Sequence, residues 1–225
     1  MALLPATDRR ANRKPASHAA ACRHLANTDP VMRRIIARVG PCRLKQYPRY
    51  FVTLCDSIIS QQLSGRVAEV IFERFADLCP RRRPTPQAVV CMPLARLRSA
   101  GLSKQKASYL KDLAKGFLDG RIRTGGFTRQ SNEDIIAALT AIHGIGRWTA
   151  EMFLMFSLNR LDVLPVDDLG IQKAIQRWYA FRQLPAASTI RRIGRPWRPY
   201  ETIACWYLWQ SLRLNSSGSS SPSRS

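Results

Sequence analysis

Hydrophobic positions recur along this chain at helical spacing, and no segment alternates as a strand does. The pattern predicts helices over 31–39, 50–62, 65–78, 86–92, 93–100, 104–117, 135–142, 147–158, 169–181 and 201–212. Asp29 and Pro30 supply an N-cap and a first-turn proline to the first of these helices, and Ser103 is the predicted cap of the helix at 104–117. In the third helix, one buried face is predicted to hold Val67, Val70, Ile71, Phe75 and Leu78. The predicted fold class is therefore all-α, with about ten helices.

Both ends of the chain lack the helical pattern. Residues 1–27 mix Arg, Ala and Pro without periodicity, and residues 215–225 are a Ser-rich stretch that buries too little apolar surface to order. We therefore predict a basic flexible tail at 1–27, one helical domain at 28–214 and a disordered tail at 215–225. The first segment lacks the apolar core of a secretory signal, and a transit peptide and a flexible basic arm both fit it.

The charge of the chain is strongly positive. Its 225 residues include 36 Lys and Arg against 15 Asp and Glu, a formal net charge of +21. Such an excess favours a polyanionic partner, with nucleic acid first and an acidic membrane surface second. No apolar run is long enough to cross a bilayer, which excludes a membrane span. With 45% hydrophobic residues, wholesale disorder is excluded as well.

The six cysteines are scattered, at positions 22, 42, 55, 79, 91 and 205, and no pair forms a CxxC. Zinc and iron–sulfur sites need closely spaced ligands, so the spacing argues against both. The pattern is typical of free thiols in a reducing compartment.

Residues 139–150 carry the most informative motif, LTAIHGIGRWTA. One amphipathic helix ends at Ile142, a tight turn holds two glycines, and a second helix begins at Arg147. Gly144 and Gly146 permit positive φ or a close approach to a ligand. The unpaired N–H groups at the start of the second helix suit a phosphate. A bare GxG also fits an ordinary corner between helices, whereas the full pattern indicates a helix–hairpin–helix.

Two adjacent aspartates, Asp167 and Asp168, follow the hairpin between apolar neighbours. A carboxylate beside a breaking glycosidic bond can stabilise positive charge on the sugar or activate water. Asp168 fits equally well as the N-cap of the helix that begins at Leu169. Both interpretations stay open at this point.

Taken together, these motifs resemble the helix–hairpin–helix DNA glycosylases. The resemblance rests on the hairpin, its spacing to Asp168, the segment SIISQQLS at 57–64 and the pattern GLSxxKxxYL at 101–110. It extends from residue 29 to residue 212, and the most similar subgroup is the alkyl-base enzymes, 3-methyladenine DNA glycosylase II, in their compact form. It implies two helical lobes that flank an active-site cleft, without an iron–sulfur cluster.

The resemblance also implies roles for single residues. Asp168 takes the position of the catalytic aspartate, which leaves Asp167 as a helix-cap or structural acid. The implied DNA contacts are Gly144, Gly146, Arg147, Thr149, Gln62 and Lys106. Of these, Gln62 matches the wedge that fills the gap left by a flipped nucleotide, although its spacing alone favours a polar loop residue. No cofactor is required, and the carbonyls of Ile142 and Ile145 are the implied ligands of a structural monovalent cation.

Position 148 sets the implied reaction class. Relatives such as endonuclease III carry a lysine nucleophile there and nick the strand, whereas this chain carries Trp148. The implied reaction is hydrolytic base excision without lyase activity. The aromatic ring suits a flipped, cationic alkylated purine, through cation–π attraction of roughly 0.5–2 kcal/mol. A structural tryptophan in the core is the alternative.

Some positions depart from the family pattern or stay without a functional role. Glu201 stands where an arginine is usual, which puts a local ion pair or DNA contact in doubt. His143 replaces a usual proline and is expected to be a tolerated turn residue. Most of the late aromatic residues are expected in the core: Trp178, Tyr179, Trp197, Tyr200, Trp206, Tyr207 and Trp209.

The sequence thus predicts a monomeric base-excision enzyme for double-stranded DNA with damaged bases. Its expected substrates are purines of the 3-methyladenine and 7-methylguanine type, with Asp168 assisting hydrolysis. A non-catalytic helix–hairpin–helix DNA-binding protein and a glycosylase for mismatched or oxidised bases are the alternatives. The expected location is the cytoplasm and nucleoid in a bacterium, and the nucleus or an organelle in a eukaryote.

Overall fold

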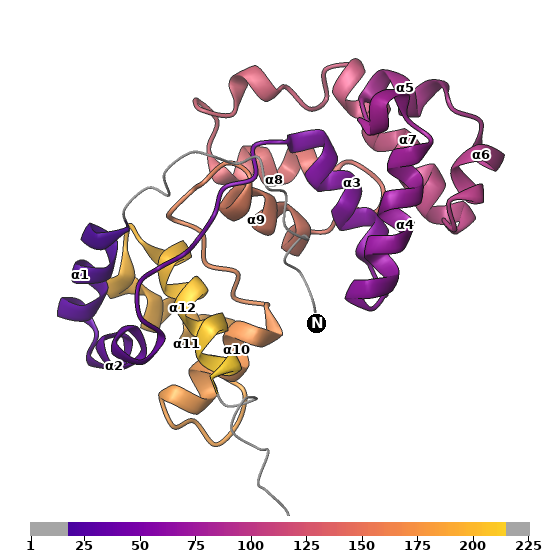
Figure 1. The fold of residues 1–225 in the computed structure, drawn as a ribbon. Coiled ribbons are helices and arrows are strands. Elements are labelled where there is room, and N and C mark those ends of the chain that lie inside the picture. The colour runs from indigo at the N-terminus through magenta and orange to yellow at the C-terminus, as the bar shows by residue number, and fades with distance from the viewer. Residues whose placement is uncertain (1–17, 215–225) are drawn as a thin grey trace, which may run out of the picture. The chain divides into compact units, whose positions relative to one another are not determined.

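The computed structural model describes residues 18–214, which divide into two compact units. One unit holds residues 47–158, and the other combines residues 18–46 with 159–214 (Figure 1). The described residues form helices and no strand, which confirms the all-α class. None of their helices is long and apolar enough to cross a membrane. Residues 1–17 of the predicted basic tail and the whole of the predicted tail at 215–225 lie outside the described residues.

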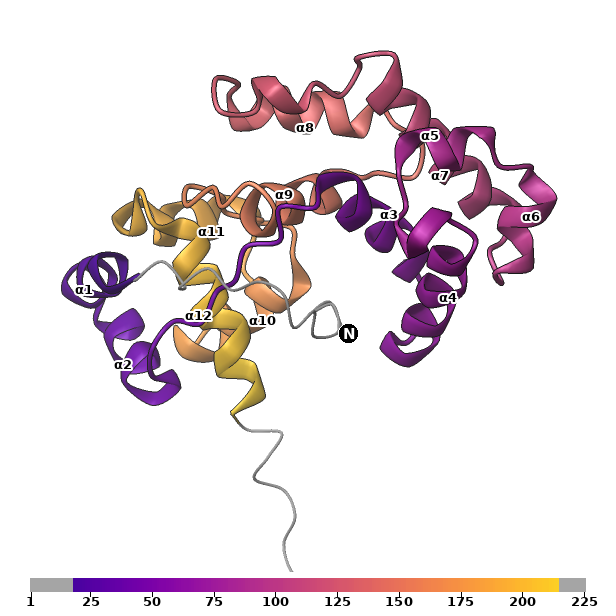
Figure 2. The same cartoon turned by 45° about the horizontal axis from the view of Figure 1, so that its top comes forward.

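The unit of residues 47–158 is built around one buried helix. Its helices are α3 (Tyr50–Ser60), α4 (Gly65–Asp77), α5 (Pro86–Cys91), α6 (Leu94–Ser99), α7 (Lys104–Leu118), α8 (Asn132–Thr140) and α9 (Arg147–Phe156), with short 3-10 turns at Pro80–Arg82 (η1) and Thr124–Gly126 (η2). The central helix, α3, packs against α4, α7 and α9 (Figure 2). Its buried side chains are Phe51, Leu54, Cys55, Ile58 and Ile59. Burial of each large apolar side chain contributes roughly 1.5–3 kcal/mol, so α3 firmly places the loop that follows it.

Local polar residues set the helix starts of this unit only in part. The Ser103 hydroxyl accepts the N–H of Lys106 at 3.1 Å, which confirms the predicted cap of α7. Ser64 stands at the N-cap of α4 without a side-chain hydrogen bond to the helix. The predicted buried face of α4 is partly wrong. Phe75 is buried as predicted, but Val67 and Val70 are 47% and 41% exposed, and the helix buries Ala68 and Ala76 in their place.

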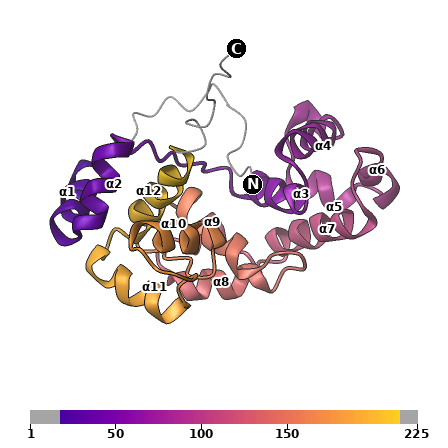
Figure 3. The same ribbon diagram turned by 90° about the horizontal axis from the view of Figure 1, so that it is seen from below.

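The second unit is built around the last helix. It contains α1 (Ala19–Thr28), α2 (Pro30–Val39), α10 (Leu169–Trp178), α11 (Ala187–Gly194) and α12 (Glu201–Arg213), with a 3-10 turn at Arg195–Trp197 (η3). Helix α12 packs against both α2 and α10 (Figure 3). Its buried side chains include Ile203, Tyr207 and Leu208. The start of α10 is therefore held against a well-packed helix.

A buried carboxylate, that of Asp29, ties three segments of this unit together. Its Oδ1 accepts the N–H groups of Val31 and Met32 at 2.8 and 3.2 Å, which confirms the predicted N-cap of α2. Its Oδ2 accepts the hydroxyl of Tyr179 at 2.5 Å and the indole N–H of Trp197 at 2.8 Å. Since both oxygens are used in packing α2 against α10 and η3, Asp29 has a structural role.

Two helices of this unit are absent from the sequence prediction. The expected tail at 1–27 is wrong from residue 19, because α1 occupies Ala19–Thr28. Ala, Leu and Arg favour helix, and burial of Ala21 and Leu25 in the packing with α2 and α12 suffices to hold one. The second is α11, whose single large buried side chain, Ile190, gives no periodic signal.

Candidate active site

One carboxylate oxygen of Asp168 accepts two hydrogen bonds, from two different helices. The backbone N–H of Ile171 in α10 donates to Oδ1 at 2.7 Å, and the indole N–H of Trp209 in α12 donates to the same oxygen at 2.8 Å. Asp168 is 9% exposed. It is thus the N-cap of α10, as one interpretation of the sequence predicts. It is also a largely buried carboxylate of fixed orientation, as the catalytic interpretation requires.

The contact between Asp168 and Trp209 requires a residue without a side chain at position 170, which is Gly170. A Cβ at this position would lie 2.9 Å from Asp168 Oδ1 and 2.9 Å from Trp209 Cδ1. Because carbon atoms pack at about 3.5–4 Å, any other residue would push these groups apart. Glycine at 170 therefore lets α12 approach the start of α10.

The segment that leads into Asp168 is anchored on α12. The N–H of Thr202 donates to Leu161 O at 2.9 Å, and the Thr202 hydroxyl donates to Arg160 O at 2.7 Å. Val163 and Val166 are buried, whereas Asp167 is exposed. Of the two roles expected for Asp167, helix cap or structural acid, the first is wrong, because Asp168 caps α10.

Glu201 is buried at the start of α12, and it has an ion-pair partner. It is 5% exposed, and Arg198 Nε lies 3.3 Å from its Oε1. Desolvation raises the pKa of this carboxyl, while Arg198 acts in the opposite direction. An ion pair therefore survives here despite the absent arginine, through the arginine three residues earlier.

In the other unit, the hairpin between α8 and α9 is closely supported by Tyr109 on α7. Gly144 has a φ of +86°, and a Cβ there would overlap the Tyr109 ring. Gly146 has a φ of −88°, and a Cβ at that position would meet no atom within 4 Å. The two glycines therefore differ: the first is required by the backbone and by packing, and the second leaves open space above the start of α9.

Asp112 on α7 holds the hairpin through His143. Its Oδ2 accepts the backbone N–H of His143 at 3.0 Å and lies 2.7 Å from His143 Nδ1. Desolvation raises the pKa of Asp112, but the hydrogen bonds from His143 and Arg121 outweigh it and bring the pKa to about 2. His143 is thus more than a tolerated turn residue, because it fastens the hairpin to α7.

The loop after α3 is joined to the same hairpin. Gln61 Nε2 donates to Gly144 O at 2.7 Å, and Lys106 Nζ donates to Ile59 O and Gln61 O at 2.7 and 2.6 Å. Desolvation lowers the pKa of the Lys106 ammonium. The structure therefore places Lys106 as a cap on the end of α3. Gln62, the residue that follows Gln61 in the loop, is exposed and has a φ of +59°.

The other predicted site residues lie in the first turn of α9. Arg147 donates to both carboxylate oxygens of Glu133, at 3.0 and 2.6 Å, and to Glu151 at 3.2 Å. The pair with Glu133 is exposed on both sides, and such pairs contribute only about 0–1 kcal/mol, so a phosphate can compete with Glu133 for this guanidinium. Thr149 is 6% exposed, which leaves little of it for DNA contact, and Trp148 is half-buried.

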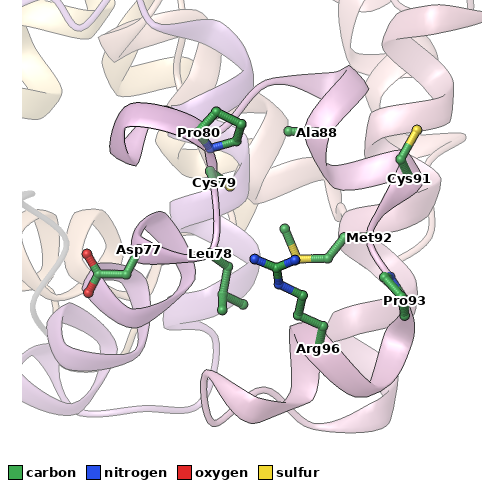
Figure 4. Close-up of a pocket in the computed structure, with 9 residues that line it drawn as sticks. All are labelled: Asp77, Leu78, Cys79, Pro80, Ala88, Cys91, Met92, Pro93 and Arg96. Atoms are coloured by element: carbon green, nitrogen blue, oxygen red, sulfur yellow. The ribbon is translucent and has the colours of Figure 1, made fainter.

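Two further features bear on ligands. The Ile142 carbonyl accepts the N–H of Ile145 at 3.1 Å. Because a carbonyl oxygen has a second lone pair and suits hard cations, this bond does not exclude a cation ligand, and the monovalent cation stays a prediction. Elsewhere in the same unit an open hollow of about 430 Å³ contains none of the predicted site residues (Figure 4). Its lining is Asp77, Leu78, Cys79, Pro80, Ala88, Cys91, Met92, Pro93 and Arg96.

Comparison with known proteins identifies the family. The model of the HhH-GPD superfamily of base excision DNA repair proteins matches residues 55–199. The chain belongs to this superfamily. DNA-3-methyladenine glycosylase 1 of Schizosaccharomyces pombe is 36% identical over 196 residues, which cover 85% of this chain and 86% of that protein.

Solved structures of this superfamily agree with the fold. A DNA-3-methyladenine glycosidase from Bacillus halodurans superposes with a TM-score of 0.82 at 33% identity, covering 90% of this chain and 94% of that one. The 3-methyladenine DNA glycosylase of S. pombe, solved in complex with abasic DNA, gives a TM-score of 0.76 at 35% identity, over 87% and 98% of the two chains.

Sequence reasoning misses the partners of the predicted site residues. The helical pattern places Trp209 in the core, whereas it is half-buried and bound to Asp168. Asp112 and Gln61, which hold the hairpin, have no role in the sequence prediction. A polar residue within the family motifs is the only available signal for Gln61, and none marks Asp112.

The difference between the two hairpin glycines predicts different effects on stability. Gly144→Ala places a Cβ against Tyr109 at positive φ, so we expect the free energy of unfolding to fall by about 2–4 kcal/mol. Gly146→Ala is the matched control, with an expected change within about 1 kcal/mol. Urea unfolding measures both, and equal losses would contradict the packing described for Gly144.

The lowered pKa of Asp112 predicts a pH-dependent contribution to stability. Its folded-state pKa of about 2 is below the ordinary 3.8, so the contribution is complete above about pH 4 and is lost as the pH falls toward 2. Asp112→Asn should therefore lower the free energy of unfolding by about 1 kcal/mol at pH 6, and by less at pH 3. Asp119→Asn, which removes the other acid paired with Arg121, is the control. A difference that stays constant between pH 6 and pH 3 would contradict this role.

Proposed function

We propose that this protein is a monofunctional DNA glycosylase that hydrolyses the N-glycosidic bond of alkylated purines, such as 3-methyladenine and 7-methylguanine. It acts on double-stranded DNA in base excision repair, flips the damaged nucleotide and leaves an abasic site. The observation that carries the proposal is the Asp168 carboxylate, largely buried and oriented by donors from α10 and α12. The names of its relatives in two organisms support the substrate class.

The proposed chemistry uses Asp168 to stabilise positive charge. As the bond between C1′ and the base lengthens, the sugar becomes oxocarbenium-like, and a nearby carboxylate stabilises it. Water then adds its oxygen to C1′ and gives up a proton. A purine alkylated on a ring nitrogen is cationic, takes both bond electrons and leaves neutral, so no strong general acid is required.

Trp148 is the proposed wall of the base pocket. Its half-buried ring lies in the first turn of α9, where bifunctional relatives carry the lysine nucleophile. An electron-rich ring face attracts a cationic base. Since no amine occupies this position, the strand is not expected to be cut by the protein itself.

The proposed DNA grip is the hairpin with its neighbouring loop. The backbone N–H groups of Gly144 and Gly146 bind a phosphate, and the carbonyls of Ile142 and Ile145 would hold a monovalent cation that adds positive charge there. Exposed Gln62 is the proposed wedge. The net charge of +21 suits a sequence-independent, salt-sensitive hold on the backbone. The compartment is that of the DNA: nucleoid in a bacterium, nucleus or organelle in a eukaryote.

The assignment of Asp168 is tested by release of free base from methylated duplex DNA. Wild type should release 3-methyladenine and 7-methylguanine, and Asp168→Asn should lower the single-turnover rate by at least about 100-fold. Asp167→Asn is the matched control, because Asp167 is the exposed neighbour, and it should keep the rate within about twofold. Chromatography of the released bases measures all three.

The same reactions separate the alternatives. Equal release by wild type and Asp168→Asn would exclude Asp168 as the catalytic group. Binding of DNA without release by wild type would favour a non-catalytic DNA-binding protein, and release only from mismatched or oxidised duplexes would change the substrate class. A covalent adduct trapped by borohydride would contradict the monofunctional mechanism.

A further inference from the structure

We propose that Trp209 is a positioning residue for Asp168, and that its indole N–H fixes which oxygen of the carboxylate can face the sugar. The inference rests on the proposed function. It assigns a role to the contact between α10 and α12 that goes beyond helix capping.

The geometry requires two donors to define the carboxylate. The terminal torsion of an aspartate is broad and nearly two-fold, so the N–H of Ile171 on Oδ1 does not by itself define the carboxylate plane. The Trp209 N–H reaches the same oxygen at 2.8 Å from a second helix. Two donors on one oxygen, from different directions, fix both the plane and the direction of Oδ2.

An ordinary helix cap does not need this second donor. Asp29, the other buried capping aspartate of this unit, uses Oδ1 for its helix and Oδ2 for Tyr179 and Trp197. In Asp168 the donors from α10 and α12 instead converge on the capping oxygen, Oδ1. The bond from α12 therefore adds nothing to the cap, and its effect is to set the orientation of the carboxylate.

A second hydrogen bond from a tryptophan also joins α10 to α12. The indole N–H of Trp178 in α10 donates to the Ser211 hydroxyl in α12, also at 2.8 Å. Both bonds join α10 to α12 through a tryptophan, but only the one from Trp209 ends on a carboxylate. A hydrogen bond to a charged acceptor is the stronger kind, and position 170 lacks the Cβ that would block it.

The matched pair Trp209→Phe and Trp178→Phe tests the proposal. Each variant keeps an aromatic ring and removes one indole donor between α10 and α12. Three quantities are measured: the single-turnover rate of base release at saturating protein, the affinity for duplex DNA with a stable abasic analogue, and the Tm. We expect Trp209→Phe to lower the rate roughly tenfold with affinity within about twofold of wild type. Trp178→Phe should keep the rate of base release within about twofold of wild type, although its Tm should fall at least as much as that of Trp209→Phe.

Three results would overturn the positioning role. A Trp209→Phe rate within about twofold of wild type would do so, as would equal rate losses in the two variants, which would indicate a general effect of loosening the helix pair. If wild type releases no base, both the proposed function and this role fail, whereas the first two results leave the proposed function intact.

If Trp209→Phe does not fold, Gly170→Ala replaces it, because the added Cβ would separate Asp168 from Trp209. The same rate loss at unchanged affinity is expected, and a wild-type rate would refute the proposal.

Discussion

The convergence of two N–H donors on one oxygen of Asp168 is the constraint on which the second unit depends. To make it, α12 must lie close to the start of α10, which requires glycine at 170 and the anchoring of the preceding segment by Thr202. The packing of α2 against α12 supports that helix from another side, and Asp29 joins α2 to Tyr179 and Trp197. A buried acid in a chain of charge +21 is thus held by a set of local interactions, each identifiable in the structure.

In the other unit, side chains of α7 and of the loop after α3 hold the backbone of the hairpin in place. Gly144 is fixed from one side by the Tyr109 ring and at its carbonyl by Gln61, while Asp112 holds the N–H of His143. A phosphate-binding turn needs its amides in place before the ligand arrives, because ordering them on binding would reduce affinity. Rigid support of the turn by α7 and the α3 loop provides that preorganisation.

The parts that could be predicted from the sequence are those with local signals. The caps at Asp29 and Ser103 and the hairpin glycines are recognisable because each acts on residues within a few positions along the chain. The pairs formed by Asp112 with His143 and by Asp168 with Trp209 are 31 and 41 residues apart, and no spacing rule connects them. Trp209 stands at helical spacing among core aromatics, so its donor role is visible only when α10 and α12 are placed together. Helices α1 and α11 escape prediction because each buries too few apolar side chains to show a period.

If the Asp168 carboxylate stabilises positive charge at the sugar, it should also favour a stable cation held in the same place. The decisive measurement is the affinity of wild type and Asp168→Asn for two duplexes, one with a cationic pyrrolidine analogue of the abasic sugar and one with its neutral tetrahydrofuran counterpart. Wild type should bind the cationic duplex at least about tenfold more tightly than the neutral one, because a transition-state-like charge meets the carboxylate, and Asp168→Asn should lose that preference while keeping its affinity for the neutral duplex. An equal preference in both proteins would show that Asp168 does not stabilise positive charge at the sugar.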